Sequence, residues 1–127
     1  MKKYKWLIIP VFIATMVLVL MKTVFFIGYV PTASMEPTLK KGSLIFGMRI
    51  FDELETGDII VFTKDGQLLV KRIAATAGET ITVDGVSYTV PAKCYFVVGD
   101  NEKNSMDSRH WIEPFVKKEC VTAKIYK

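Results

Sequence analysis

The chain has 127 residues, about one domain by length, with 17 Lys and Arg, 13 Asp and Glu and a net charge of +4. Four of the basic residues lie within the first 22 residues and none of the acidic ones precedes Glu36, which leaves 13 of each sign in residues 31–127. A neutral domain argues against a nucleic-acid binder, 50% hydrophobic content argues against disorder, and two cysteines do not make a disulfide scaffold.

The first thirty residues predict a membrane anchor. Three lysines within residues 1–5 precede an apolar run over 6–30, which only Lys22 interrupts. This run exceeds the length of about 20 residues that a helix needs to cross the hydrocarbon core of a bilayer. Lys22 lies near its far end, where a long side chain can reach the interface. The lysines predict that residues 1–5 are cytoplasmic and that the domain after the span, residues 31–127, lies on the outer side of the cell membrane.

Two other interpretations of this segment compete with an uncleaved single anchor. A cleaved signal peptide usually has an apolar core of about 7–15 residues, and Thr32-Ala33-Ser34 is a poor cleavage site. A buried helix that is apolar on all faces would need a large core around it, which about 97 remaining residues do not easily provide. We therefore expect a single-pass anchor over 6–30.

Residues 31–127 predict a small all-β domain. Segment 31–39 is rich in small residues, and Pro37 disfavours helical geometry at Glu36. Asp65-Gly66 and Asp84-Gly85 are typical of hairpin turns, and 101–114 is expected to be a polar loop. The β-like runs between turn signals are 43–51, 59–63, 67–75, 80–83, 86–90, 95–98 and 120–126. They indicate a partly closed, β-barrel-like domain behind the transmembrane helix.

Ser34 is the first candidate for chemistry, because it lies in a tight segment just beyond the membrane. A nucleophilic serine needs space for a carbonyl group and nearby donors for the oxyanion. Ala33 leaves that space, and the Ser34 amide and the Thr32 hydroxyl are candidate donors. A serine in such a loop is more commonly only a turn residue, so this segment alone is weak evidence.

Lys71 is the second candidate. Strand alternation places it on the same face as Leu69 and Ile73, and an apolar environment disfavours the ammonium form and lowers the pKa of a lysine. A lysine with a lowered pKa can act as a general base near neutral pH. The competing interpretation is a strand lysine whose head reaches water.

The polar segment 99–109 is the third candidate, because it holds the carboxylates of Asp100 and Asp107, an arginine and two serines. Its spacing does not fit an EF-hand, and no metal-ligand spacing is found among two cysteines and one histidine. That histidine, His110, has no assigned role. Whether Cys94 and Cys120 pair is left open.

Taken in order, four segments resemble those of type I signal peptidases, the membrane-anchored Ser-Lys proteases that remove signal peptides. Thr32–Leu39 is similar to their nucleophile segment, Gly57–Phe62 to a structural segment, Lys71–Glu79 to the general-base segment, and Gly99–Arg109 to the Gly-Asp-Asn…Ser-x-Asp-Ser-Arg segment. Only 20 residues separate Gly78 from Gly99, where larger members carry a second β domain, so the chain resembles the minimal form of the family.

The resemblance implies roles for individual residues. Ser34 is the expected nucleophile and Lys71 the base, Thr32 helps to form the oxyanion hole, and Ser105 orients the lysine. It implies two supporting ion pairs, Asp107 with Arg109 and Asp100 with Arg72. Met35 and Leu69 are candidate walls for the substrate pockets.

The implied reaction is the cleavage of signal peptides from secreted preproteins at the outer face of the membrane, through an acyl-enzyme and without a metal or cofactor. The expected partners are these preproteins and the lipid bilayer, and no nucleic acid. Two alternatives stay open: a specialised processing peptidase of the same fold, of the pilin or conjugation type, and a catalytically silent anchored module that binds export partners.

Overall fold

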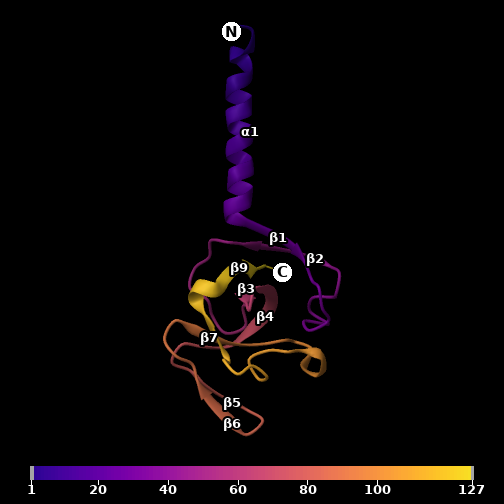
Figure 1. Ribbon diagram of the computed structural model, residues 1–127, viewed down its shortest axis with the longest axis vertical. Coiled ribbons are helices and arrows are strands. Elements are labelled where there is room, and N and C mark those ends of the chain that lie inside the picture. The colour runs from indigo at the N-terminus through magenta and orange to yellow at the C-terminus, as the bar shows by residue number, and fades with distance from the viewer. Residues whose placement is uncertain (1, 127) are drawn as a thin grey trace.

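A straight helix and a mainly antiparallel sheet make up the computed structural model, which describes residues 2–126 (Figure 1). Helix α1 spans Lys5–Val24. The nine strands are β1 (Phe25–Tyr29), β2 (Leu44–Met48), β3 (Ile59–Lys64), β4 (Gln67–Thr76), β5 (Thr80–Val83), β6 (Val86–Thr89), β7 (Cys94–Val98), β8 (Phe115–Lys117) and β9 (Val121–Ile125). Three short 3₁₀ turns cover Lys2–Tyr4, Glu102–Asn104 and Lys118–Cys120.

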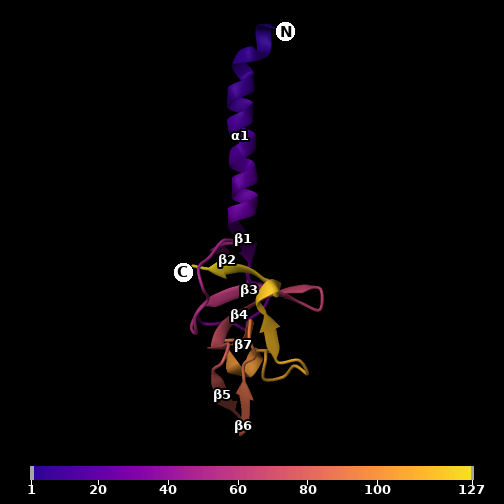
Figure 2. The ribbon, with the colours of Figure 1, turned by 90° about the vertical axis from the view of Figure 1, so that its left-hand side faces the viewer.

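Helix α1 is long and apolar enough to cross a membrane, with a mean hydropathy of 2.4. Its 20 residues correspond to about 30 Å, the thickness of the hydrocarbon core of a bilayer. The helix projects away from the domain, and the β5–β6 hairpin forms the opposite end of the molecule (Figures 1 and 2). None of the helix residues is buried. The domain therefore supplies no cover for this apolar surface.

The predicted anchor over 6–30 is not one helix, because its last residues form a strand. The helix ends at Val24, and Phe25 immediately begins β1, whose residues pair with β2 from Phe25↔Met48 to Tyr29↔Leu44. The aromatic and branched side chains of β1 favour a strand once a partner edge is present. The Arg49 amide also donates to the Val24 carbonyl oxygen at 2.6 Å, so the end of the helix is joined directly to the sheet.

Seven strands form one open sheet in the order β1-β2-β9-β3-β4-β7-β8, and every neighbouring pair is antiparallel. The all-β prediction is confirmed, but the sheet does not close into a barrel, because β1 and β8 are its two edges. The predicted hairpin turns occur at Asp65-Gly66 and Asp84-Gly85, whose φ angles are all positive. Strands β1 and β8 were not predicted as strands. Cys94 and Cys120 are free thiols.

The two faces of the central strands bury separate apolar clusters. Val61 and Ile59 lie in a cluster that also contains Met35, whereas Ile60 and Ile73 lie in another. A third cluster around Phe96 joins the β5–β6 hairpin to the sheet. Alternation along β3 and β4 thus divides neighbouring residues between two cores.

Candidate active site

The segment that carries Ser34 is fixed at both of its ends. The Val30 amide donates to the Ser43 carbonyl at 2.9 Å, and the Gly42 amide donates to the Val30 carbonyl at 2.7 Å. Met35 and Leu39 anchor the segment in the apolar core, and the Leu39 amide closes a single turn on the Met35 carbonyl at 2.9 Å. Because Met35 is fully buried, the adjacent Ser34 has little freedom to move.

Ser34 is 5% exposed, and its hydroxyl oxygen accepts a hydrogen bond from the Thr32 hydroxyl at 3.1 Å. In this arrangement the proton of the Ser34 hydroxyl is not used in the bond to Thr32. The Ser34 amide points to the same Thr32 oxygen at the long distance of 3.5 Å. Thr32 and the Ser34 amide therefore lie side by side.

Lys71 lies on β4 opposite Ile60, on the face where Ile73 is buried. The residue is only 4% exposed, and within residues 2–126 its ammonium has no hydrogen bond or ion pair. Burial lowers the pKa of Lys71 below 10.5, the charge of Asp107 raises it in part, and the charge of Arg109 lowers it further. A buried amine without an ion-pair partner favours the neutral form.

Ser34, Lys71 and Ser105 converge on the backbone of Gly99. The pairing Arg72↔Val98, continued by one residue, places Lys71 opposite Gly99. A Cβ atom on Gly99 would lie 2.6 Å from the Ser34 carbonyl oxygen and would also overlap the Ser105 hydroxyl. No hydrogen bond joins Ser34 and Lys71 in the described part of the chain. Such contacts are commonly longer before substrate binds.

The resemblance to signal peptidases predicts that Gly99→Ala lowers the rate of peptide cleavage by about 10²-fold, because an ångström-scale displacement of the expected nucleophile costs about this much. The added methyl group meets a backbone oxygen, which cannot rotate out of its way as a side chain can. The measurement is cleavage of a model preprotein in detergent micelles. In the control Gly28→Ala, the two nearest atoms belong to the Phe26 side chain, and equal losses in the two variants would contradict the prediction.

Asp107 is fully buried and lies at the centre of a hydrogen-bonded cluster beside Lys71. Its carboxylate accepts bonds from the Ser105 hydroxyl at 2.8 Å, the Gly99 amide at 2.9 Å, and Nε and Nη2 of Arg109 at 2.8 Å each. Burial alone would raise the pKa of Asp107, but the bonds from Arg109, Gly99 and Ser105 lower it to about 2. The carboxylate therefore stays ionised through the neutral range and holds Ser105 in place.

A second ion pair joins the strand of Lys71 to the segment after β7. Arg72 Nε and Nη2 donate to the two Asp100 oxygens at 2.8 Å each, and its Nη1 donates to the Gly57 carbonyl at 2.7 Å. The hydrogen bond with Arg72 lowers the pKa of Asp100 and raises that of the arginine. The two ion pairs thus lie at neighbouring positions, one beside Gly99 through Asp107 and one at Asp100.

The two candidates for pocket walls lie in different places. Met35 belongs to the cluster that packs against Val70, whereas Leu69 packs against the cluster on the other face of β4. These two residues do not line one common apolar surface. The sequence pattern missed Val70, because the alternation argument selected the face of Lys71 and Leu69.

Asn101 is a further polar residue to which the sequence assigned no role. Its backbone amide donates to the Ser34 carbonyl at 2.8 Å, and its side-chain Nδ2 donates to the Ala33 carbonyl at 3.0 Å. Its place directly after Gly99-Asp100 is the only sequence signal for it. Among residues 2–126, no group of three or more His, Cys, Asp and Glu side chains is placed to hold a metal ion.

Comparisons with known proteins identify the family. The profile described as "Signal peptidase, peptidase S26" matches residues 3–88 and 84–126. The chain is 30% identical over 86% of its length to "Signal peptidase I" of Bacillus amyloliquefaciens, covering 79% of that protein, and 31% identical over 81% of its length to "Probable signal peptidase I-1" of Synechocystis, covering 72%. A match of 31% identity to "Inactive signal peptidase IA" of Staphylococcus aureus spans 64% of this chain and 49% of that protein. The chain therefore belongs to the peptidase S26 family of signal peptidases and is a serine endopeptidase whose function is the cleavage of signal peptides.

Proposed function

We propose that Ser34 and Lys71 form the catalytic dyad with which this chain cleaves preproteins. The observation that carries the proposal is a buried lysine without a hydrogen bond or ion pair among the described residues. It directly precedes Arg72, which pairs with Val98, and the residue after Val98, Gly99, is the one against which the Ser34 backbone packs. Burying an amine in this way costs stability, and a structural lysine would be expected to have a carboxylate partner. A base that must be neutral needs this environment.

In the first half of the reaction, neutral Lys71 takes the hydroxyl proton of Ser34 while the serine oxygen attacks the scissile carbonyl carbon. The carbonyl electron pair moves to its oxygen, which receives hydrogen bonds from the Ser34 amide and the Thr32 hydroxyl. The carbonyl re-forms and the C–N bond breaks. The Lys71 ammonium returns its proton to the leaving amine.

In the second half, Lys71 removes a proton from water, and the resulting hydroxide attacks the ester carbon of the acyl-enzyme. The tetrahedral intermediate collapses, the bond to the Ser34 oxygen breaks, and the ammonium returns the proton to that oxygen. The products are the signal peptide with a new carboxyl terminus and the mature protein with a new amino terminus. Ser105, whose hydroxyl donates to Asp107, is the residue assigned to orient the lysine head once substrate is bound.

The substrate binds as an extended strand beside the segment of Ser34 and strand β4, in the β-augmentation mode. Val70, which is partly buried and packs against the cluster of Met35, is the candidate contact for small side chains at the first and third positions before the scissile bond. Leu69, on the opposite face of β4, is the weaker candidate for this role.

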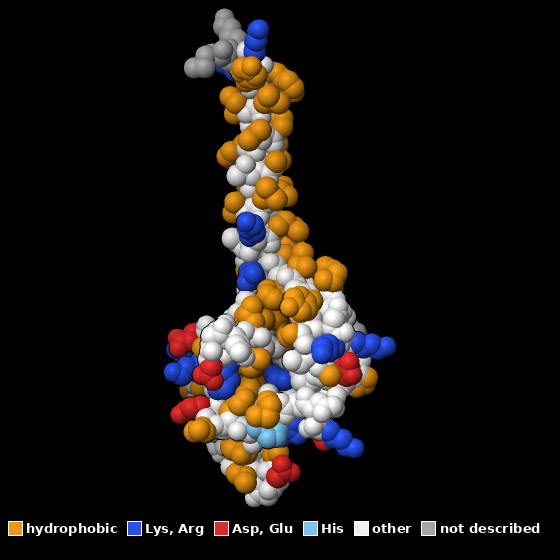
Figure 3. Space-filling model, turned by 45° about the vertical axis from the view of Figure 1, so that its right-hand side comes forward, with side chains coloured by type: hydrophobic (Ala, Val, Ile, Leu, Met, Phe, Trp, Pro, Cys, Tyr) orange, Lys and Arg blue, Asp and Glu red, His pale blue; other side chains and the backbone are white. Residues whose placement is uncertain are grey.

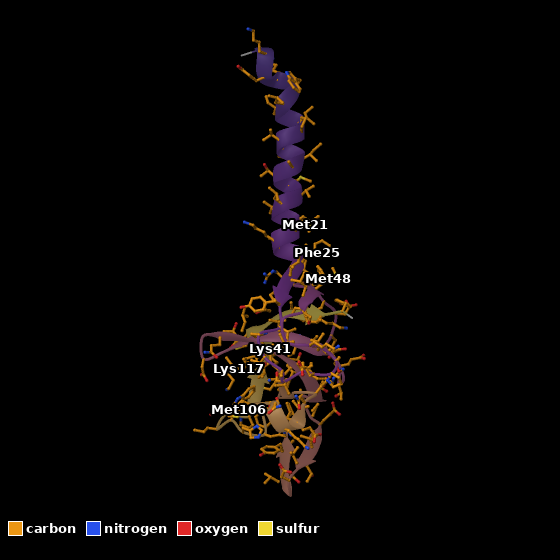
Figure 4. All side chains as sticks on the ribbon, turned by 90° about the vertical axis from the view of Figure 1, so that its right-hand side faces the viewer. Met21, Phe25, Lys41, Met48, Met106 and Lys117 are labelled. Carbon is orange, nitrogen blue, oxygen red and sulfur yellow. The ribbon has the colours of Figure 1, made fainter. Side chains whose placement is uncertain are left out.

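The proposed site is the outer face of the cell membrane, with residues 1–5 in the cytoplasm and α1 as the single anchor. Apolar side chains cover the helix and continue onto the adjoining end of the domain (Figure 3), where Met21, Phe25 and Met48 lie at the junction (Figure 4). The Thr15 and Thr23 hydroxyls donate to carbonyls four residues earlier, so they need no water within lipid. The exposed apolar residues of β1, β2 and the bend after β2 are Ile27, Tyr29, Leu44, Phe46 and Ile50.

The pH dependence of kcat/KM tests the role of Lys71. Because only the neutral amine accepts the Ser34 proton, cleavage of a model preprotein in detergent micelles should rise with pH through the lowered pKa of Lys71 and fall in acid. Asp107, with its pKa of about 2, does not titrate between pH 5 and 9. Full turnover near pH 5 would count against the proposal.

His110 is the only histidine and lies 3.6 Å from Asp107, so it requires a control in this experiment. In a His110→Gln variant the acid limb should persist, because it belongs to the lysine. Loss of the acid limb in this variant would assign it to the histidine instead.

The silent-module alternative corresponds to the relative named "Inactive signal peptidase IA". Both Ser34 and Lys71 are present in this chain, whereas loss of either is the signature expected of a silent relative. Absence of cleavage by the wild-type chain over a panel of preproteins would favour that alternative.

A further inference from the structure

Asn101 makes two hydrogen bonds to the backbone on either side of the Ser34 side chain. Its amide donates to the Ser34 carbonyl at 2.8 Å, and its Nδ2 donates to the Ala33 carbonyl at 3.0 Å. The Ala33 oxygen also accepts the Glu36 amide at 3.1 Å. The carbonyl groups of Ala33 and Ser34 are therefore both occupied by hydrogen bonds from within the domain.

The bond from Asn101 to Ala33 also determines where the Ser34 amide points. Ala33 C=O and Ser34 N–H belong to one planar trans peptide unit, so they point in opposite directions. Holding the Ala33 oxygen therefore fixes the direction of the Ser34 N–H group. That group makes only a 3.5 Å contact with Thr32, which leaves it available to a substrate oxygen.

Asn101 is itself rigidly placed. Its neighbour Asp100 makes a bidentate ion pair with Arg72, the residue after Lys71, and the Asn104 amide donates to the Asn101 carbonyl at 3.0 Å. The same short segment thus contacts the strand of the base and the segment of the nucleophile. A rigid donor on this segment can hold the peptide unit of Ser34 in a fixed relation to Lys71.

We propose that Asn101 is a positioning residue that orients the Ser34 amide as an oxyanion donor by holding the Ala33 carbonyl. The inference rests on the proposed role of Ser34 as the nucleophile. Because the amide contacts the substrate oxygen mainly when it carries negative charge, loss of the Asn101 side chain should lower kcat more than it raises KM.

The test uses Asn101→Ala and Asn101→Asp in the full chain in detergent micelles. Alanine removes the donor, and aspartate keeps the shape but offers no N–H group. We expect kcat for a model preprotein to fall at least about 10-fold in both, with KM within about twofold, since losing an oxyanion donor outright costs about 10²–10³-fold. Asn104→Ala is the matched control, because the Asn104 side chain has no hydrogen bond in the described structure.

A peptide aldehyde gives a readout that a purely structural role would not change. The Ser34 oxygen adds to the aldehyde carbon, the carbonyl electron pair moves to the aldehyde oxygen, and the hydroxyl proton passes to Lys71. The affinity of the enzyme for the aldehyde should fall by a factor similar to the fall in kcat. The midpoint of thermal unfolding of each variant should stay above the assay temperature.

Three outcomes would overturn the inference: kcat within twofold of wild type, a change in KM alone, or a loss of kcat that disappears when rates are divided by the folded fraction. The proposed function is judged separately with Ser34→Ala. If that variant still cleaves, the nucleophile assignment fails. If it is inactive while the Asn101 variants are fully active, only the positioning role fails.

Discussion

We expect Ser34→Ala and Lys71→Met each to lower the cleavage of a model preprotein by at least about 10³-fold, since the nucleophile and its base act as one unit. The double variant should be no slower than either single variant, because a base without a nucleophile contributes nothing. Additive losses would contradict a shared step. The rate is measured in detergent micelles under single-turnover conditions, so that product release does not hide the chemical step.

Matched controls separate the dyad from general effects of substitution. Ser87→Ala alters a serine on the β5–β6 hairpin, and Lys117→Met alters an exposed lysine on β8, well away from the helix (Figure 4). Both should cleave at the wild-type rate. Lys71→Arg keeps a cation that does not lose its proton near neutral pH, so it should be as inactive as Lys71→Met. Activity in the arginine variant would refute proton transfer by Lys71.

The stability of Lys71→Met distinguishes catalysis from support of the fold. The lysine is buried on the face of Ile60 and Ile73, and within the described residues its ammonium has no hydrogen bond or ion pair. Replacing it with an apolar side chain of similar length removes a desolvation cost. We therefore expect the inactive Lys71→Met variant to unfold at the same temperature as wild type or at a higher one. A lower midpoint would indicate that the lysine supports the fold.

The central strands were predictable because their local signals agree with their environment. Along β3 and β4 the alternation of side chains matches two separate cores, and Asp65-Gly66 supplies the positive φ angles of the turn. Strand β1 was not predictable, because Phe25–Tyr29 continues an apolar run, and hydropathy does not distinguish a helix in lipid from a strand with a partner. Strand β8 has only three residues and depends on its pairing with β7.

The site was predictable where a residue's chemistry is unusual for its place. A lysine among Leu69 and Ile73 can be recognised from alternation, and its burial follows. The convergence on Gly99 and the bonds of Asn101 to two carbonyls could not be predicted, because backbone acceptors have no sequence signature. Which face of β4 contacts Met35 also depends on the path of residues 31–39 across the sheet.

The second large effect is expected from Asp107→Asn. The asparagine keeps the shape of the carboxylate but leaves the guanidinium of Arg109, whose side chain is 15% exposed, without its counter-charge. Breaking a buried pair in this way typically costs about 3–5 kcal/mol. We expect a loss of this size in the free energy of unfolding, measured with urea in micelles. A parallel loss of cleavage is expected because the asparagine has only one acceptor oxygen, which cannot accept from both Ser105 and Arg109 Nε in their present places. Lys124→Gln, which removes the more exposed pair with Asp58, should cost less than about 1 kcal/mol.

The pH dependence of unfolding checks the same carboxylate without a substitution. Its pKa is lowered from 3.8 to about 2 in the folded chain, so the native state favours the ionised form. The resulting stabilisation, about 2 kcal/mol, is fully present above about pH 4 and is lost as the pH falls through 2. In Asp107→Asn this part of the loss of stability in acid should be absent. The free energies of unfolding of the two proteins, plotted against pH, should therefore converge toward pH 2. Parallel curves between pH 5 and pH 2 would show that Asp107 is not held ionised by Arg109, and the support assigned to Ser105 would lose its basis.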